Sequence, residues 1–457
     1  MSSYLEEAMK QAAEARRREP KSTGPLTGPI PRWVSDEEKQ AKRFFPRQPD
    51  SLEKTGLPRG LVEALSLKVL FRQPGYTGKQ LSRQLCLHIN VIREVMDDLK
   101  QRKVVVYRGG TATGDFSYEL SESGQQLAVD YSRRSMYAGP APVTLEDYLE
   151  SVAAQSVRRE KLQPVDLERA FADLSFDNQF LRRLGPAIAS ARGLFLHGEP
   201  GNGKTSLARR IALAFGHGVF IPHAIWVGGF IFKIFDPQVH KAMAPLKGER
   251  RRSDTRWVLS ERPAVIAGGE LTMESLEVAW NETAGVCTAP LQVKANAGIL
   301  VLDDLGRQRM DTTELFNRWI VPMEDRIDYL SLPDGRKVAF PFDPFLVFAT
   351  NLDPTELVDE AFLRRIPYKI SVHDPSETIF RRLLAEQSEA MELKPDPGVF
   401  DHLMEVWYHA NGRPLRACHP RDLLMQVRDQ CQFFQEPMVV NRQNLDDAAR
   451  NYFIKTS

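Results

Sequence analysis

A glycine-rich loop between a short apolar run and an amphipathic segment constrains the fold of this chain more than any other feature. The loop has the pattern G-x-x-x-x-G-K-T, from Gly198 to Thr205, and the apolar run before it, 194–196, has the length of a buried strand. After the loop, apolar residues recur at helical spacing as far as Ala214. A strand, a glycine-rich turn and a helix in this order predict a phosphate-binding loop.

The residue types in the loop indicate the ligand. Glycines let backbone N–H groups turn toward an anion, and the N-terminus of the following helix adds the positive end of its dipole. We expect Lys204 to reach the β- and γ-phosphates of a nucleotide and the Thr205 hydroxyl to ligate Mg²⁺. The predicted nucleotide-binding residues are Gly198, Glu199, Pro200, Gly201, Asn202, Gly203, Lys204, Thr205 and Ser206.

A second motif supplies two acidic residues. The continuous apolar run 299–302 predicts a strand buried on both faces of a parallel sheet, and Asp303 and Asp304 follow it directly. Carboxylates at the end of a buried strand are costly unless a metal or another partner offsets their charge. We therefore expect Asp303 to hold Mg²⁺ and Asp304 to polarise an attacking water as a general base.

Three further positions complete the candidate site. The apolar run 345–350 predicts another buried strand, and Asn351 at its end is placed to orient water against a γ-phosphate. Arg364 and Arg365 are adjacent and lie between a helix and a strand, where they would face a neighbouring subunit. Arg421, in the phrase CHPRDLL, offers an arginine from a separate helical region.

Taken in this order, the motifs resemble those of AAA+ ATPases over residues 190–457. The resemblance implies an α/β fold: a P-loop AAA+ core with a parallel sheet and a C-terminal helical lid, using ATP and Mg²⁺ as cofactors. By position it assigns the phosphate-loop lysine to Lys204 and the loop's magnesium ligand to Thr205. It assigns the magnesium-site acid to Asp303, the catalytic acid to Asp304 and the first sensor to Asn351. The arginine finger falls on Arg365, with Arg364 beside it, and the second sensor on Arg421.

Smaller similarities bear on the branch of that family. The stretch 293–307, VKANAGILVLDDLGR, resembles the segment that contains the acidic strand in MoxR-type ATPases. Residues 315–342 resemble the helix and β-hairpin that precede the first sensor in those proteins, where the hairpin faces the central pore. The phrase DDLG also occurs in helicase loaders and transposition helpers, while the lack of a GAFTGA-like loop argues against a sigma-factor activator. Asp304 replaces the usual glutamate, which keeps open a nucleotide-gated scaffold with little turnover.

The remaining sequence divides into an arm, a small domain and a connection. Residues 1–50 are rich in charge, proline and glycine and predict a flexible arm. Residues 51–137 predict three helices, a hairpin and a helix, which resembles a winged helix, and 138–190 predict a linker and helices. The nucleotide-binding domain is expected over 191–372 with a partly β insert at about 225–295, and the helical lid over 373–457.

The winged-helix-like domain leaves two roles open. His88, Asn90 and Arg93 could address DNA, but Glu94 and its acidic neighbours 97–98 on the same predicted helix would repel the phosphate backbone. Docking of a protein is the alternative, because winged helices serve in both ways.

Composition limits the remaining possibilities. The 457 residues are 42% apolar and 26% charged with a net charge of +1, as expected for a soluble, multidomain protein without a global preference for nucleic acid. Four widely spaced cysteines and the lack of a membrane-length apolar run predict a cytoplasmic location. We expect a homo-oligomer that forms a ring of six subunits and remodels an unidentified protein client. The alternative is a DNA-bound ATPase that contacts DNA through residues 51–137.

Overall fold

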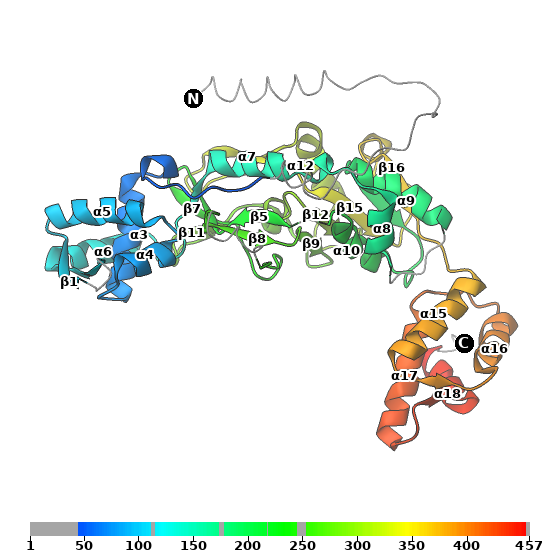
Figure 1. The fold of residues 1–457 in the computed structure, drawn as a ribbon. Helices are drawn as coiled ribbons and strands as arrows, with labels where there is room; N and C mark the ends of the chain where they lie inside the picture. Colours follow the sequence, from blue (N-terminus) through cyan, green and yellow to red (C-terminus); the bar gives the residue numbers. More distant parts are fainter. Residues whose placement is uncertain (1–43, 111–114, 173–177, 217, 245–252, 454–457) are drawn as a thin grey trace, which may run out of the picture. The chain divides into compact units, whose positions relative to one another are not determined.

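The structure, a computed structural model, describes residues 44–453 except 111–114, 173–177, 217 and 245–252 (Figure 1). Its element order alternates helices and strands along much of the chain. The predicted α/β class with a parallel sheet is confirmed. No helix of the described residues is both long and apolar enough to cross a bilayer. The predicted arm lies outside the described residues apart from its end, 44–50, and so does one stretch of the predicted insert, 245–252.

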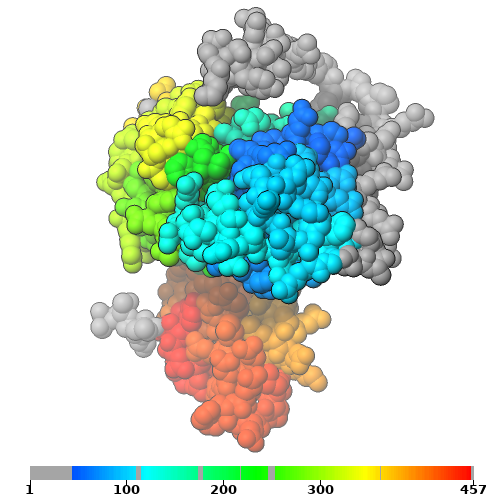
Figure 2. All heavy atoms as spheres, turned by 90° about the vertical axis from the view of Figure 1, so that its left-hand side faces the viewer, coloured from blue at the N-terminus to red at the C-terminus, as the bar shows by residue number. Residues whose placement is uncertain are grey.

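The first group of elements shares one apolar core. It comprises α3 (Arg59–Arg72), α4 (Gly78–Leu85), α5 (Ile89–Gln101), an antiparallel pair β1 (Val105–Gly110) and β2 (Phe116–Leu120), and α6 (Glu122–Arg134). Thr77 and Gln80 form a capping box that starts α4, and Ser121 accepts a hydrogen bond from the backbone of Gly124 to start α6. These elements, blue to cyan in Figure 2, follow the order predicted from the sequence; their assignment as a winged helix stays a prediction.

A five-stranded parallel sheet carries the phosphate-loop motif. Its strand order is β16 (Tyr368–Ser371), β4 (Leu194–His197), β15 (Phe345–Thr350), β12 (Ile299–Leu302) and β9 (Ala264–Ala267). Every neighbouring pair is parallel, so the carboxyl ends of all five strands lie at one edge of the sheet. The motifs that follow β4, β12 and β15 therefore meet at this edge.

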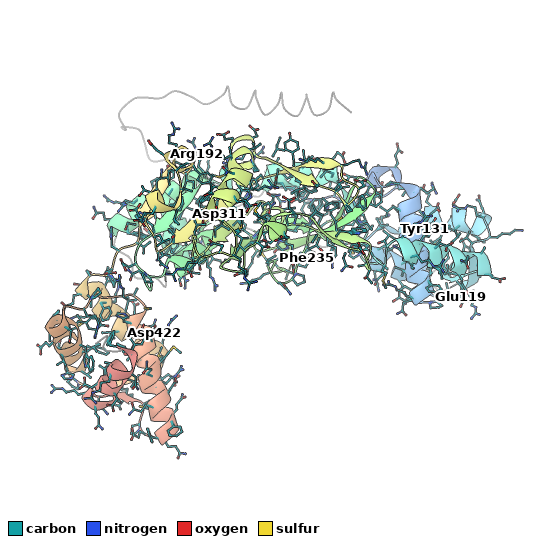
Figure 3. The ribbon with its side chains drawn as sticks, turned by 180° about the vertical axis from the view of Figure 1, so that it is seen from behind. Glu119, Tyr131, Arg192, Phe235, Asp311 and Asp422 are labelled. Atoms are coloured by element: carbon teal, nitrogen blue, oxygen red, sulfur yellow. The ribbon has the colours of Figure 1, made fainter. Side chains whose placement is uncertain are left out.

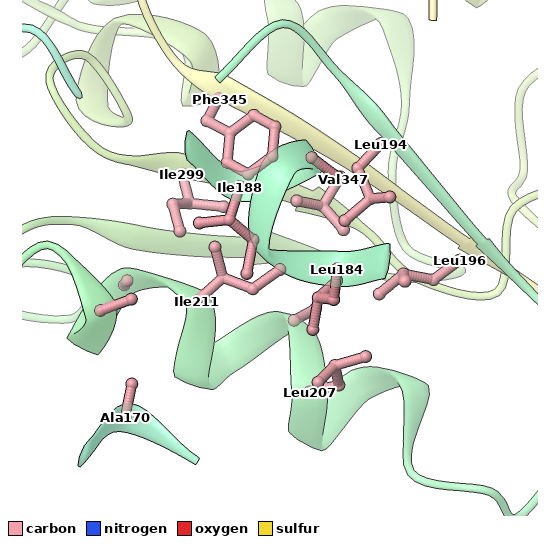
Figure 4. Packing of buried hydrophobic residues seen from close by; sticks show 14 of the residues in the cluster. Ala170, Leu184, Ile188, Leu194, Leu196, Leu207, Ile211, Ile299, Phe345 and Val347 are labelled. Carbon is pink, nitrogen blue, oxygen red and sulfur yellow. The ribbon is translucent and has the colours of Figure 1, made fainter. Parts of the chain in front are cut away.

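Helices cover both faces of the sheet, which explains why its strands are continuous apolar runs. On one face, α8 (Pro164–Ala170), α9 (Asn178–Ser190) and α10 (Lys204–Ala214) pack against β4, β12 and β15 (Figure 4). On the other lie α12 (Thr312–Asp325), α13 (Pro354–Leu357) and α14 (Glu360–Leu363). Asp311, labelled in Figure 3, caps α12 by accepting from two backbone N–H groups.

The predicted insert forms a second sheet. Its order is β10 (Ala279–Asn281), β11 (Val286–Thr288), β7 (Phe230–Lys233), β6 (Ala224–Val227) and β3 (Val143–Thr144), the last coming from the predicted linker. Three further groups of elements accompany this sheet: the strand pair β5 (Val219–Pro222) and β8 (Trp257–Ser260), the helices α7 (Leu145–Gln155) and α11 (Leu291–Lys294), and the hairpin β13 (Ile327–Ser331) and β14 (Lys337–Pro341). The hairpin exists as predicted, with Leu330, Leu332 and Phe340 buried in the core of this second sheet.

The C-terminal helical unit has a core of its own. It contains α15 (Glu377–Ala390), α16 (Val399–His402) continuing into the π-helical turn η5 (Leu403–Tyr408), α17 (His419–Phe434) and α18 (Arg442–Tyr452), with the short pair β17 (Lys394–Pro395) and β18 (Val439–Val440). These helices lie in the region expected as the helical lid, 373–457, and the role of a lid stays a prediction.

Candidate nucleotide-binding site

The glycine-rich loop joins β4 to α10 and has a backbone that other residues would strain. Gly198 has φ +134° and Gly201 has φ +85°. A Cβ atom at Gly198 would lie 2.4 Å from the carbonyl oxygen of Val372, and one at Gly201 would lie 2.6 Å from Cys418 Sγ. Glycine is required at both positions for conformation and for space.

Lys204 is buried at the start of α10, where three oxygen atoms surround its ammonium group. Its Nζ donates to the carbonyl oxygens of Gly198 at 2.7 Å and Glu199 at 2.9 Å, and to Asn351 Oδ1 at 2.6 Å. Burial lowers the pKa of Lys204, although the nearby carboxylate of Asp304 opposes that shift. The amine thus lies inside the loop at the edge of the parallel sheet.

The acidic motif meets the loop as the sequence predicts. Thr205 Oγ1 donates a hydrogen bond of 2.7 Å to Asp303 Oδ2, across 98 positions of sequence. Asp303 is itself fixed at the end of β12, because its backbone N–H donates to Ala267 of β9. A threonine hydroxyl beside a carboxylate oxygen matches the hard oxygen ligands that Mg²⁺ prefers, so these two residues fit the predicted metal.

Asn351 connects the lysine to the second acid. Its Oδ1 accepts from Lys204, and its Nδ2 donates to Asp304 Oδ1 at 3.1 Å. Asp304 is exposed and adopts φ +50°, a left-handed conformation that costs energy for a residue other than glycine. The three side chains come from different elements and form one chain of contacts.

A cavity of about 480 Å³ opens beside the loop. The ends of β4, β15 and β16 line it, and its volume is in the range of ligand pockets. Its polar lining side chains are His197, Glu199, Asn351, Asp353, Ser371, His373 and Asp374.

Residues before α17 reach the loop, and the sequence did not single them out. The side chain of Arg416 pairs with Glu199 Oε2 at 2.9 Å and with Asp374. Asn202 donates to Asp374 Oδ1 at 2.6 Å, and the backbone N–H of Cys418 donates to Gly201 at 2.9 Å. The C-terminal helical unit therefore contacts the phosphate loop through its segment 416–418.

The three arginines predicted as finger and second sensor contact acidic residues or solvent and not the phosphate loop in the described contacts. Arg421 is 61% exposed and pairs with Asp422 of the same turn of α17, which Figure 3 labels. Arg365 pairs with Glu324 of α12, and Arg364 is exposed at the C-terminus of α14. The roles predicted for these arginines stay predictions. The pairs Arg416–Glu199 and Arg365–Glu324 had no signal in the sequence beyond the residue types themselves.

Comparison with known proteins gives a family match and distant structural similarities. A family model described as "Domain of unknown function (DUF8689)" matches residues 376–451, within the C-terminal helical unit. No curated protein matches the chain.

Among solved structures, the RuvB Holliday junction branch migration motor of Thermotoga maritima is similar at 13% identity and a TM-score of 0.36, over 64% of this chain and 72% of that one. NtrX of Brucella abortus in complex with ATP is similar at 12% identity and a TM-score of 0.39, over 72% of this chain and 64% of that one. At such identities and TM-scores, the function proposed below depends on the residues of the site.

Proposed function

We propose that this chain is an AAA+ ATPase that binds ATP with Mg²⁺, hydrolyses it to ADP and phosphate, and works as a homo-oligomer that remodels a protein client. The observation that carries the proposal is the convergence of Lys204, Thr205, Asp303, Asp304 and Asn351 at one edge of the parallel sheet. Within that family, the hairpin between α12 and β15 favours the MoxR-like branch.

Each residue has a distinct role in the proposed reaction. Lys204 binds the β- and γ-phosphate oxygens, and Thr205 and Asp303 would hold Mg²⁺, whose charge would stabilise the developing negative charge on the phosphates. Asp304 accepts a proton from the attacking water, which Asn351 orients. In this scheme Arg416, beside Glu199 of the loop, is a second candidate for the role that the sequence assigns to Arg421.

Replacing the proposed base tests hydrolysis. Asp304→Asn keeps a side chain of the same shape and can still accept from Asn351, but it cannot take up a proton. We expect nucleotide affinity within about twofold of wild type and turnover reduced by roughly 10²–10⁴-fold, measured by phosphate release and by titration with a fluorescent nucleotide. Turnover at the wild-type rate would exclude Asp304 as the base; a wild type without turnover under any condition would favour the nucleotide-gated scaffold.

A DNA-directed role is the second candidate, and contacts of α5 favour it. Its three acidic residues have partners within the chain: Glu94 pairs with Arg59, Asp98 with Arg102, and Asp97 accepts from the Tyr107 hydroxyl. The two arginines offset the charges of Glu94 and Asp98, which reduces the repulsion of DNA phosphates, and Asn90 and Arg93 are exposed on the same helix.

Duplex binding by the full chain separates the two candidates. A DNA role predicts affinity that falls steeply with salt and that Arg93→Ala weakens, with Arg133→Ala on α6 as the matched control. Salt-independent or undetectable binding would favour the protein client.

A further inference from the structure

Arg365, the predicted arginine finger, is held by a carboxylate of its own chain. Its Nε donates to Glu324 Oε1 at 2.7 Å, and its Nη2 lies 2.6 Å from the same oxygen. Glu324 lies on the last turn of α12, whereas Arg365 follows α14. The Arg365 side chain is 27% exposed and that of Glu324 is 52% exposed, so the pair lies at the protein surface.

The backbone on both sides of this ion pair is fixed by the core. Met323, next to Glu324, is buried, and so are Phe362 and Ile366 on either side of Arg365. All three belong to the same apolar cluster beneath the parallel sheet. Because the core sets the separation of the two backbones, the ion pair orders only the two side chains, which reduces its entropic cost.

The pairing also fixes the direction of the guanidinium. A guanidinium has five N–H donors in a rigid planar fork. The contacts through Nε and Nη2 place the Glu324 carboxylate along one side of that fork, and this determines where the end of the fork points. A group that must meet a phosphate on another subunit benefits from such orientation, because misplacement by about 1 Å can cost on the order of 10²-fold in rate.

We propose that Glu324 is a positioning residue: it orients Arg365 toward the nucleotide of a second copy of this chain. The inference rests on the proposed ATPase function with a finger supplied in trans. A carboxylate that competed with the phosphate for Arg365 would instead lower turnover, and the test below separates the two effects. We favour orientation because an exposed ion pair contributes little electrostatic free energy, so Glu324 would compete only weakly with a phosphate. By contrast, a guanidinium held along one edge loses most of its conformational freedom.

Mixing two inactive variants isolates the finger-donating chain. Arg365→Ala has an intact phosphate loop and no finger, and Lys204→Ala has a finger and no functional loop, so turnover of the mixture measures donation by the second chain. Adding Glu324→Ala to the Lys204→Ala donor should lower this turnover by on the order of 10-fold or more. Adding it to the Arg365→Ala acceptor should have no effect.

Two control variants distinguish orientation from charge and from structural damage. Glu324→Gln in the donor keeps an oxygen that accepts from Nε and should preserve at least half of the rescue. Asp325→Ala, next on α12 and equal in charge change, should also preserve it; the described residues show no ion pair for Asp325.

The possible outcomes are separable. A donor carrying Glu324→Ala that rescues as well as or better than the unmodified donor would overturn the positioning role, and better rescue would indicate competition. An equal loss in donor and acceptor would show a structural effect instead and would also overturn it. No rescue with the unmodified donor would refute the trans finger, and this inference with it, while phosphate release by the wild type would still support the ATPase.

Discussion

At the scale of single residues, the site is a set of side chains whose partners lie far away in the sequence. Asn351 holds both Lys204 and Asp304, so the group expected to meet the γ-phosphate and the group expected to activate water are linked through one amide. Arg416 similarly joins the phosphate loop to Asp374 after β16. Each of these residues can be tested by a single substitution.

Lys204→Ala should reduce ATP affinity to below detection without unfolding the chain. The alanine cannot bind phosphate, and the partly buried acceptors that it leaves unpaired should lower the free energy of unfolding by no more than about 1–3 kcal/mol. Nucleotide titration and thermal unfolding measure the two effects. Lys241→Ala, an exposed lysine with the same charge change, is the control, and wild-type affinity in Lys204→Ala would refute the site.

Arg416→Ala should impair the reaction more than Arg421→Ala does. Arg416 contacts the phosphate loop, and its loss also leaves the Glu199 carboxylate without its counter-ion beside the expected phosphates. We expect kcat/KM for ATP to fall by about 10-fold or more in Arg416→Ala, roughly the loss of one charge-assisted contact, and by less than twofold in Arg421→Ala. The reverse order would return the second-sensor role to Arg421, as the sequence predicts.

At the scale of elements, α17 is the helix that connects the C-terminal helical unit to the phosphate loop. The segment before α17 contacts Gly201 and Asn202, and the first residue of α17, His419, is buried. His419 Nδ1 lies 2.9 Å from the Tyr408 hydroxyl, and burial lowers the pKa of His419 to about 4. The start of α17 should therefore be sensitive to acid.

The C-terminal helical unit should lose stability as the pH falls from about 6.5 to 4. The pKa of His419 is lower in the folded chain than its ordinary value of about 6.5, so protonation favours the unfolded state. The contribution is fully present above pH 6.5 and decreases by up to about 1.4 kcal/mol per pH unit below it. Hydrogen exchange of α17 and α18 measures this slope, and His419→Gln should flatten it. An unchanged slope in that variant would assign the acid sensitivity to another group.

At the scale of the whole molecule, we propose that a second copy of the chain completes the expected site. Arg365 is fixed at the surface by Glu324, and stabilisation of a phosphate on a neighbouring chain is the role that an arginine finger performs in trans. Oligomerisation and turnover should then be coupled.

Turnover per chain should rise with protein concentration as subunits assemble. Arg365→Ala should bind ATP normally and hydrolyse it about 10³-fold more slowly, and mixing it with Lys204→Ala should restore part of the activity. Arg364→Ala tests the adjacent exposed arginine, which is the other candidate for the finger: loss of turnover in that variant but not in Arg365→Ala would transfer the role to Arg364. Turnover that does not depend on concentration, together with no rescue on mixing, would rule out a finger in trans.

The elements that depend on local pattern could be predicted from the amino-acid sequence. The strand, loop and helix of 194–214 and the buried strands before Asp303 and Asn351 were predicted with nearly their observed bounds, because glycine geometry and continuous apolar runs act over a few residues. The resemblance that these motifs carry predicted that the acids and the amide act on the same nucleotide as the loop, and the structure brings them together at one edge of the parallel sheet.

The pairing of side chains that are distant in sequence depends on tertiary packing and could not be predicted. Nothing in the local pattern distinguishes Arg416 from Arg421, or marks Glu324 as the partner of Arg365, since these pairs join residues 41 to 217 positions apart. The strand β3, expected as linker, forms because residues 143–144 find an unpaired edge at β6. Such contacts depend on how the cores pack against one another, and packing is a property of the whole chain that no short window of sequence contains.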